Sequence, residues 1–510
     1  MTTQGRARSL WLQVGLAAFL AWTVAFAASM APVFERFEWA SWDWRVQWLA
    51  TPSDHSKRIR LVLIDQQSLD WASDVNQISW PWPRQAYEPL LGFLERAGAE
   101  LVVFDMLFTE PSSYGVSDDN RLAEALQRAP PSVGAVALGN GQPLRLDELP
   151  SDRLLSDRGS PARVGHLPPA ERLVLPIPPL EKSFDRLGNV HVQPDADSVF
   201  RRLAPYRLFR GEPMPSLATA AWELLNPDSG WPDIPVDAQG RGVLHFRGDV
   251  GLYEPLSAAS LIQSELRLRQ GRETALDPRE LEGQIVMIAP SAAGLLDLGA
   301  TPMSSVSPRV LVHATALDNL LGGDWMHTTP RLWLAFYLAL LAFGVALATR
   351  YLHSLWQTLI ILALCAGLPW VLAVGAYQAG LWLPLIAPTL AAFIAFALTL
   401  FWNYMTEGRQ RRFIKQAFQQ YLSPAVIERL VSDPQRLTLG GEARELTLLF
   451  SDIQGFTSVA ESLSAERLTE LLNNYLSAMT DIILDTGGTI DKYEGDAIIA
   501  FWNAPLDQPN

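Results

Sequence analysis

The stretch ELTLLFSDIQGFT, residues 445–457, joins an apolar, β-prone run to an abrupt carboxylate and then a glycine. The apolar residues predict a buried strand that ends at Asp452. Gly455 lets the backbone turn tightly, so the QGFT loop presents backbone N–H groups just after the carboxylate. A lone aspartate at a strand end is usually a turn residue, so the chemistry depends on what lies beside it.

A second stretch, GTIDKYEGDAIIAFW at residues 488–502, predicts two strands around a tight turn at Glu494–Gly495. Between the two stretches, residues 464–484 place leucine, tyrosine, methionine and isoleucine on one helical face. The order is therefore strand, helix, hairpin. In this order the end of the first strand can lie beside the hairpin turn, so Asp452 and Asp496 can share one site.

Two carboxylates at strand ends suit hard cations such as Mg²⁺, which proteins hold with one or two carboxylates plus substrate phosphates. Two such ions, about 3.5–4 Å apart, can activate an attacking oxygen and stabilise a leaving one in phosphoryl transfer. We therefore expect Asp452 and Asp496 to act at a phosphate site, with the QGFT loop cradling a triphosphate. EGD alone is a common hairpin turn and QGFT alone is a weak signal. The occurrence of both motifs in this order along the chain strengthens the prediction of a phosphate site.

Four apolar segments are each close to the roughly 20 residues that cross a bilayer core. They predict transmembrane helices over residues 11–30, 332–349, 355–377 and 381–404. The first segment is also compatible with a cleaved signal peptide, because Arg6 and Arg8 precede it and AFAAS at 25–29 resembles a cleavage site. Its length favours a retained anchor.

Basic residues predict the orientation of these helices. They flank the first span on its N-terminal side and follow the second and fourth spans, whereas the QAG link between spans three and four is uncharged. The positive-inside rule then places residues 1–10 and the C-terminal region in the cytoplasm. Residues 35–328 lie outside, in a multi-pass protein of the inner (plasma) membrane.

The exported region alternates strand and helix signals. Residues 59–65, 100–108 and 283–289 read as buried strands, and residues 87–99 read as a helix. This alternation predicts an α/β domain. Residues 140–180 are rich in Pro, Arg, Asp and Leu and predict long surface loops.

Composition narrows the function further. The chain has 510 residues, enough for two or three domains, and a formal net charge of −14. This acidic balance argues against a general nucleic-acid partner. One cysteine, Cys365, cannot form an intrachain disulfide. A hydrophobic share of 49% with 18 tryptophans is typical of a membrane protein.

Residues 405–436 are predicted to link membrane and cytoplasm. Within them RRFIKQAFQQYL, residues 411–422, spaces its apolar side chains as a helix does. This pattern fits a solvated amphipathic helix and a dimerising, signal-carrying helix equally well.

From about Leu437 to Asn510 the chain resembles the class III adenylate/guanylate cyclase catalytic domain. The resemblance is carried by LGGEARELTLLFSDIQGFTSVAE and LTELLNNYLSAMTDIILDTGGTIDKYEGDAIIAFW. It implies a cytoplasmic α+β, ferredoxin-like (palm-type) domain that works as a homodimer. It also implies attack of the ribose 3′-oxygen of ATP on the α-phosphate, which gives cyclic AMP and pyrophosphate.

The resemblance assigns roles to single residues. It implies that Asp452 and Asp496, assisted by the Ile453 carbonyl, bind two Mg²⁺ or Mn²⁺ ions. It implies that the loop of Gly455, Phe456 and Thr457 binds the phosphates through backbone amides, and that Lys492 reads adenine N1, which favours ATP over GTP. The family domain continues further than Asn510, so we expect the cyclase domain of this chain to be incomplete.

Residues 35–325 or so resemble a CHASE2 sensor domain. The resemblance is carried by IRLVLIDQQSLDW, WPWPRQAYEPLL, ELVVFDMLF, DADSVFRRLAPY and VHATALDNLL. Three membrane spans commonly follow that domain, as here. Trp82, Pro83 and Arg84 are interpreted as packing residues in preference to a ligand site, and no sensor ligand is predicted.

Together these features predict a multi-domain membrane protein: a receptor-type adenylate cyclase whose exported α/β sensor acts through four transmembrane helices. The expected partners are ATP, the lipid membrane, a second copy of the chain and an unknown extracytoplasmic signal. The alternative is a non-enzymatic or truncated membrane sensor. A guanylate cyclase is disfavoured by Lys492. A diguanylate cyclase is weaker still, because GGDWM at 322–326 lies on the exported side.

Overall fold

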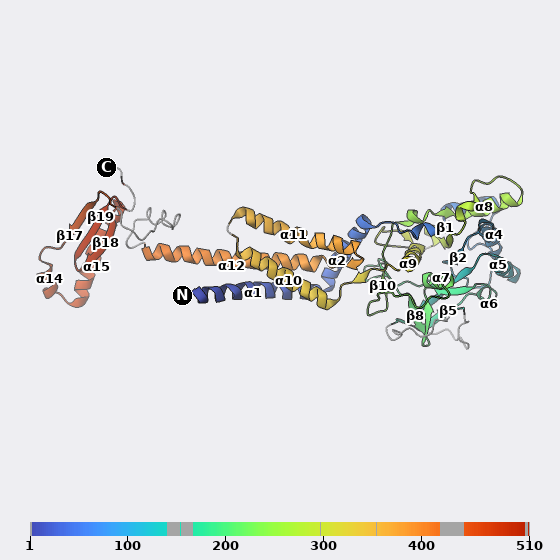
Figure 1. Cartoon of the computed structure of the whole chain (residues 1–510), viewed down its shortest axis with the longest axis horizontal. Helices are drawn as coiled ribbons and strands as arrows, with labels where there is room; N and C mark the ends of the chain where they lie inside the picture. Colours follow the sequence, from blue (N-terminus) through green and yellow to red (C-terminus); the bar gives the residue numbers. More distant parts are fainter. Residues whose placement is uncertain are drawn as a thin grey trace. The chain divides into compact units, whose positions relative to one another are not determined.

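The computed structural model divides the chain into two compact units, Gly15–Ala348 with Leu352–Ala395, and Met1–Val14 with Thr349–Tyr351 and Phe396–Asn510. Both are drawn in Figure 1. The residues described are 3–139, 153–154, 167–295, 297–352, 354–418, 443–504 and 508, with side chains from residue 11 onward and, in the last membrane helix, up to residue 405.

A mainly parallel sheet forms the centre of the sensor. Its order is β11-β1-β12-β2-β3, with β5 and β6 both pairing β3. Every strand pair is parallel except β3 with β5. The bounds are β1 (Ile59–Ile64), β2 (Leu101–Phe104), β3 (Ser132–Gly139), β5 (Arg172–Val174), β6 (Arg186–Asn189), β11 (Leu256–Ser257) and β12 (Ile285–Pro290).

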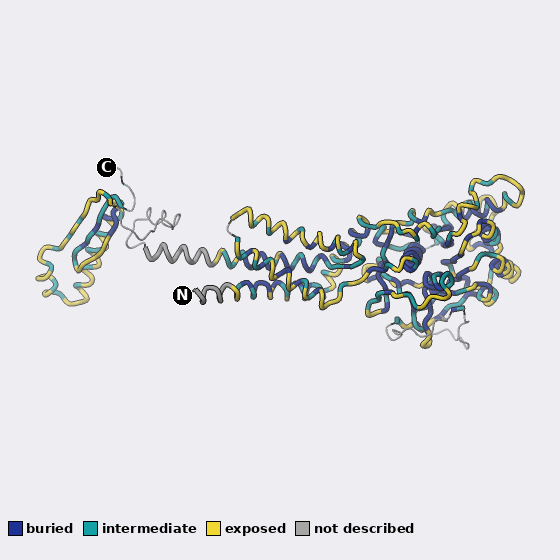
Figure 2. The backbone as a smooth tube through the Cα atoms, viewed as in Figure 1, coloured by how far each residue is buried: buried dark blue, intermediate teal, exposed yellow. Residues whose placement is uncertain are grey.

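Helices cover both faces of this sheet, because side chains of successive strand residues point to opposite faces. Leu101 and Val103 lie in one apolar core with α7 (Leu217–Leu225) and α9 (Val310–Gly322). Val102 and Phe104 lie in a second core with the opposite helices. These are α4 (Tyr87–Ala97), α5 (Val116–Arg128) and α8 (Ala258–Arg269), beside α3 (Gln66–Asn76). The predicted α/β sensor is confirmed. The buried positions of its sheet appear dark blue in Figure 2.

Three small sheets complete the sensor. They are formed by β4 (Pro169–Ala170), β8 (Tyr206–Phe209) and β9 (Glu212–Pro215), by β7 (Arg202–Leu203) and β10 (Gly242–Val243), and by β13 (Leu298–Gly299) and β14 (Ser307–Pro308). Of these strands, β4 lies in the region 140–180 predicted as surface loops, most of which falls outside the described residues.

Four helices in the described part of the chain are long and apolar enough to cross a membrane. They are α1 (Thr3–Ala28), α10 (Arg331–Arg350), α11 (Leu355–Gln378) and α12 (Ile386–Phe418). The last helix begins five residues after the predicted start at residue 381. Leu381–Trp382 instead forms β16, which pairs in parallel with β15 (His327–Thr328).

Helix α2 (Pro32–Leu49) was not predicted and follows α1 almost directly. The predicted linker over residues 405–436 is described only as far as Phe418, where α12 ends. Its remaining residues lie outside the described part of the chain.

The C-terminal segment contains β17 (Thr447–Ser451), α14 (Phe456–Ser462), α15 (Ala465–Asp485), β18 (Thr489–Glu494) and β19 (Ala497–Trp502). Its antiparallel sheet has the order β17-β19-β18. Ile483 of α15 packs against Ile490, Ile498 and Ala500, so α15 covers one face of the sheet. The strand–helix–hairpin order matches the sequence prediction.

Candidate functional site

The two predicted metal carboxylates lie at the same end of the C-terminal sheet. Asp452 follows β17 directly, and the next residue, Ile453, donates its backbone N–H to Asp496 Oδ2 at 3.1 Å. Asp452 is exposed and Asp496 is half-buried. One hydrogen bond thus joins the tip of the first strand to the hairpin, which is the juxtaposition that the motif order predicted.

The hairpin turn lies one residue later than predicted. Glu494 pairs with Ala497, so the two residues between them, Gly495 and Asp496, form the turn. Gly495 has φ +67°, a conformation that glycine adopts without steric cost. Asp496 is therefore a turn residue, and its carboxylate accepts the hydrogen bond from the Ile453 amide.

The QGFT loop folds back on the same strand end. Gly455 has φ +74°, and the helix α14 begins at the next residue. Phe456 donates its backbone N–H to the Ile453 carbonyl at 3.2 Å. The Phe456 amide, predicted to bind phosphate, therefore contacts the carbonyl predicted to bind a metal. A carbonyl has a second lone pair, so this contact leaves Ile453 able to accept another partner.

The donor set fits Mg²⁺ or Mn²⁺. It consists of oxygen atoms, from two carboxylates and one carbonyl, which hard cations prefer. In the described part of the chain, no group of three or more His, Cys, Asp or Glu residues could hold a metal ion. The arrangement suits an ion that takes its other ligands from water and substrate phosphates.

A β-bulge decides which way Lys492 faces. Ile490 pairs with Ala500 but Lys492 pairs with Ile499, so the extra residue Asp491 interrupts the alternation. Ala500 lies against α15, and Ile499 therefore lies on the opposite face, together with Lys492. The Lys492 side chain is 54% exposed and its Nζ lies 3.5 Å from Glu494 Oε1.

That opposite face is apolar and uncovered in the described residues. Leu448 pairs with Phe501 and Phe450 pairs with Ile499, and Phe450 is 70% exposed. Lys492 thus lies on the same face as these apolar side chains and four residues before Asp496 in the chain, an arrangement that suits an apolar, planar base.

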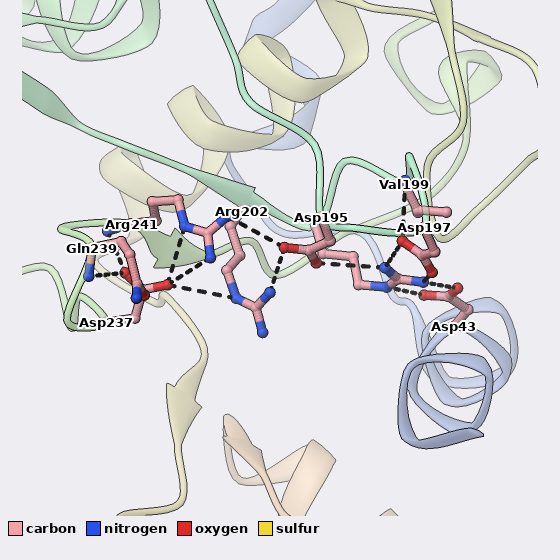
Figure 3. Close-up of polar contacts among 9 residues, drawn as sticks. Asp43, Asp195, Asp197, Val199, Arg202, Asp237, Gln239 and Arg241 are labelled. Carbon is pink, nitrogen blue, oxygen red and sulfur yellow. Dashed lines mark hydrogen bonds and ion pairs between the residues drawn. The ribbon is translucent and has the colours of Figure 1, made fainter. Parts of the chain in front are cut away.

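In the sensor, the DADSVFRR motif (residues 195–202) builds an ion network (Figure 3). Arg201 is buried and binds Asp43 at 2.7 Å and Asp197 at 2.8 Å. Arg202 and Arg241 both pair with the buried carboxylate of Asp195. Opposite charges raise the pKa of Arg201 further above its ordinary value despite its burial.

This network joins the sensor to the segments that lie next to the long apolar helices in the chain. Asp43 belongs to α2, and the Arg202 guanidinium lies over the Trp382 ring of β16 at 5.2 Å. Glu38 of α2 accepts the backbone N–H groups of Leu385 and Ile386 at 2.8 and 3.0 Å. Glu38 therefore satisfies free amides at the start of α12.

The sequence reasoning missed Glu38, Asp43 and Arg45. Arg45 is fully buried and donates to Glu38 and to the Leu383 carbonyl. The available signal was the presence of five charged residues within the tryptophan-rich run FERFEWASWDWRVQW. The structure places Trp82 in the apolar core, and Arg84 lies over the Phe108 ring.

Comparison with known families decides the affiliation of the sensor. The model of the CHASE2 domain matches residues 17–349. The chain belongs to the CHASE2 domain family. The match covers the α/β sensor, the C-terminal part of α1 and nearly all of α10.

Several relatives of this CHASE2 protein are adenylate cyclases by name. The adenylate cyclase of Anabaena cylindrica is 36% identical over 92 residues, 18% of this chain and 17% of that protein. Adenylate cyclase 1 of Rhizobium meliloti is 36% identical over 70 residues, 13% of this chain and 10% of that protein. The CHASE2 chain thus spans less than a fifth of the length of these relatives.

Among solved structures, the adenylyl cyclase CyaB from P. aeruginosa is 55% identical where it aligns. The alignment covers 12% of this chain and 33% of that chain, with a TM-score of 0.12.

Proposed function

We propose that this CHASE2 protein is a membrane-bound, receptor-type adenylate cyclase that converts ATP into cyclic AMP and pyrophosphate. The observation that carries the proposal is the hydrogen bond from the Ile453 amide to Asp496, which brings two strand-end carboxylates to one place. The similarity to proteins named adenylate cyclase supports the same reaction.

In this proposal Asp452, Asp496 and the Ile453 carbonyl hold Mg²⁺ or Mn²⁺. When bound, the ions activate the ribose 3′-oxygen and stabilise the charge on the phosphates. The backbone of Gly455, Phe456 and Thr457 lies against the triphosphate and orients it.

Lys492 reads the base. Its ammonium can donate to adenine N1, whereas guanine carries a hydrogen at N1 that opposes it. The exposed apolar face beside Lys492 gives the adenine ring a surface to lie on.

The proposed topology places the sensor outside the cytoplasm and the cyclase segment inside. The four apolar helices and the basic residues after the second and fourth of them support this orientation. The proposed working form is a homodimer in the inner (plasma) membrane.

The test is cyclic AMP production by membranes that carry the chain, with ATP and Mn²⁺. Asp452→Ala is the test variant, and Asp485→Ala is the matched control, because Asp485 is an exposed carboxylate at the far end of α15. Production that falls with Asp452→Ala and persists with Asp485→Ala supports the proposal. If the unsubstituted chain makes no cyclic nucleotide, the alternative of a membrane sensor without its own cyclase activity is favoured.

A further inference from the structure

A cavity of about 420 Å³ opens at the carboxyl edge of the sensor sheet. Its wall includes Asp105, which follows β2, Pro290, which ends β12, and Val190, which follows β6. In open α/β sheets, ligands bind in the crevice beyond the carboxyl ends of parallel strands. None of the residues assigned above to catalysis or to the ion network lines this cavity.

Two buried hydrogen-bonding atoms in the cavity wall lack partners in the described part of the chain. Asp105 is 7% exposed and its Oδ2 has no hydrogen-bond partner there. His313, on α9, is 2% exposed and its Nδ1 is likewise unpaired. Buried polar atoms are normally satisfied, so two orphans in one cavity point to a missing ligand.

The hydrogen bonding of His313 fixes what this ligand must offer. His313 Nε2 lies 3.2 Å from the Val190 carbonyl, which can only accept, so Nε2 carries the proton. Burial lowers the pKa of His313 to about 4, so the ring is neutral near pH 7 and Nδ1 is an acceptor. Asp105 Oδ2 is also an acceptor when ionised. Asp105 Oδ2 and His313 Nδ1 therefore both need a hydrogen-bond donor from the ligand.

The charges around the cavity favour a cationic donor. Two carboxylates, Asp105 and Asp297, face one guanidinium, that of Arg309, which lies 3.5 Å from Asp297. One negative charge is left over when both carboxylates are ionised. Burial raises the pKa of Asp105 to about 7 and that of Asp297 to about 6, with Arg309 opposing both shifts, so these carboxyl groups take up a proton below those pH values when no further counter-ion is present.

Apart from His191, the side chains of the rest of the wall are apolar. Leu107, Val192, Phe200 and Leu295 line the cavity, and Trp80, which is partly exposed, also lines it. An aromatic face of this kind attracts a cation, and the aliphatic side chains suit a hydrocarbon body.

We propose that this cavity binds a small protonated amine with an apolar body, whose ammonium donates to Asp105 Oδ2 and His313 Nδ1. The amine is a ligand of the sensor and is not consumed.

The position of His313 connects the ligand to the membrane. His313 and Arg309 lie at the start of α9, and α9 is followed by β15 and then by the membrane helix α10. Further along α9, the fully buried Asp318 and Asn319 bind Ser53 and His245. A ligand that contacts α9 thus acts on the element that leads into α10.

The test uses the full chain in detergent or lipid nanodiscs and reads out binding, so it does not depend on cyclase activity. Two sets of probes are used, one based on phenethylamine and one on butylamine. Each set contains the amine, the corresponding alcohol and the corresponding carboxylic acid, which are similar in shape and are positively charged, neutral and negatively charged at pH 7. Calorimetry and thermal shift measure their binding at pH 7. We expect at least one amine to bind, at least tenfold more tightly than its alcohol, and the acids not to bind.

Asp105→Asn keeps the shape of the side chain and removes its charge, and it should weaken amine binding at least tenfold. Asp74→Asn, at an exposed carboxylate on α3, is the matched control and should bind normally. The folded state of each variant is verified by its circular dichroism spectrum and thermal transition, and His313→Gln provides a second variant if Asp105→Asn does not fold.

A second readout is the number of protons released when the amine binds. At pH 6 an amine that replaces the proton on Asp105 should release up to one proton per site, seen as a dependence of the binding heat on the buffer. The other charged or titratable groups that line the cavity are Asp297, Arg309, His191 and His313. Burial raises the pKa of Asp297 to about 6, so Asp297 can also release a proton, and the release should decrease in Asp105→Asn. Equal binding of amine and alcohol, unchanged binding by Asp105→Asn, or failure of every amine to bind overturns the proposal.

Discussion

Two aspartates in this CHASE2 protein occur in the same sequence pattern, directly after an apolar strand, but in opposite physical environments. Asp452 follows the apolar strand β17 and Asp105 follows the apolar strand β2. Asp452 is exposed beside a hairpin turn, whereas Asp105 is buried at the edge of a sheet covered by helices on both faces.

The difference in burial separates the ligands that the two carboxylates suit. An exposed carboxylate remains ionised at low cost and can share a hydrated, highly charged cation with phosphates. A buried carboxylate must find a counter-charge or take up a proton. The same motif, an aspartate after an apolar strand, therefore leads to two different proposals, a metal–phosphate site at Asp452 and an organic-cation site at Asp105.

The largest effect should come from removing the partner of a buried carboxylate in the same sensor. Arg201→Ala removes the guanidinium that pairs with Asp43 and Asp197, and loss of one partner of a buried ion pair costs about 3–5 kcal/mol. Thermal unfolding of the full chain should show a melting temperature lower by about 10 °C.

Arg272→Ala, at an exposed arginine, is the control for this loss and should change the melting temperature little. Equal stability of Arg201→Ala and Arg272→Ala would show that the ion network does not stabilise the sensor. The argument that a buried carboxylate in this sensor needs a counter-charge would then fail. The contrast between Asp105 and Asp452, which depends on that argument, would fail with it.

Asp452→Ala should act on catalysis alone. A metal ligand contributes several kcal/mol to the transition state, so cyclic AMP production should fall about 100-fold or more. The side chain is exposed, so the melting temperature should stay the same. A fall in melting temperature comparable to that of Arg201→Ala would assign Asp452 a structural role instead.

The strands that precede the two aspartates could be predicted from the sequence, but the burial of each carboxylate could not. The apolar runs at residues 59–65 and 100–108 predicted the sheet, and the strand–helix–hairpin order predicted the proximity of Asp452 and Asp496. The pattern VVFD gave no sign that Asp105 is enclosed, because α9, which closes the cavity, lies about 200 residues away in the chain.

Local backbone irregularities also escaped the sequence reasoning. The bulge at Asp491 sets the direction of Lys492, and the pairing of Leu381–Trp382 with His327–Thr328 delays the start of α12. Both depend on pairing between segments, which residue preference along one segment does not encode.

A pH titration of stability should distinguish Asp105 from the paired carboxylates. The pKa of Asp105 in the folded chain is about 7, above its ordinary value near 3.8, because burial disfavours the charged form. The folded state thus holds the proton more tightly. This contribution to stability is complete below about pH 4 and is lost as the pH rises to 7, by at most about 1.4 kcal/mol per pH unit.

Two buried histidines give the opposite slope. Burial lowers the pKa of His313 and of His245 to about 4, so these groups destabilise the fold as the pH falls from 6.5 to 4. The difference between the unsubstituted chain and Asp105→Asn isolates the carboxylate. Denaturant unfolding at pH 5, 6 and 7 should show the advantage of the unsubstituted chain shrinking with pH, and a constant difference would contradict the assignment.

The smallest effect should come from Lys492, whose ammonium is exposed and pairs with Glu494 at 3.5 Å. Lys492→Glu replaces a donor with an acceptor on the apolar face, so turnover of ATP should fall about tenfold, a loss of about 1.4 kcal/mol in transition-state binding. Stability should not change, because exposed ion pairs contribute little. Parallel assays with ATP and GTP measure the effect, with Lys182→Glu in the sensor as the control. A fall in ATP turnover with no relative gain for GTP supports a role of Lys492 in binding the base without selecting it. Unchanged ATP turnover means that the base does not lie on the sheet face to which the bulge at Asp491 directs Lys492.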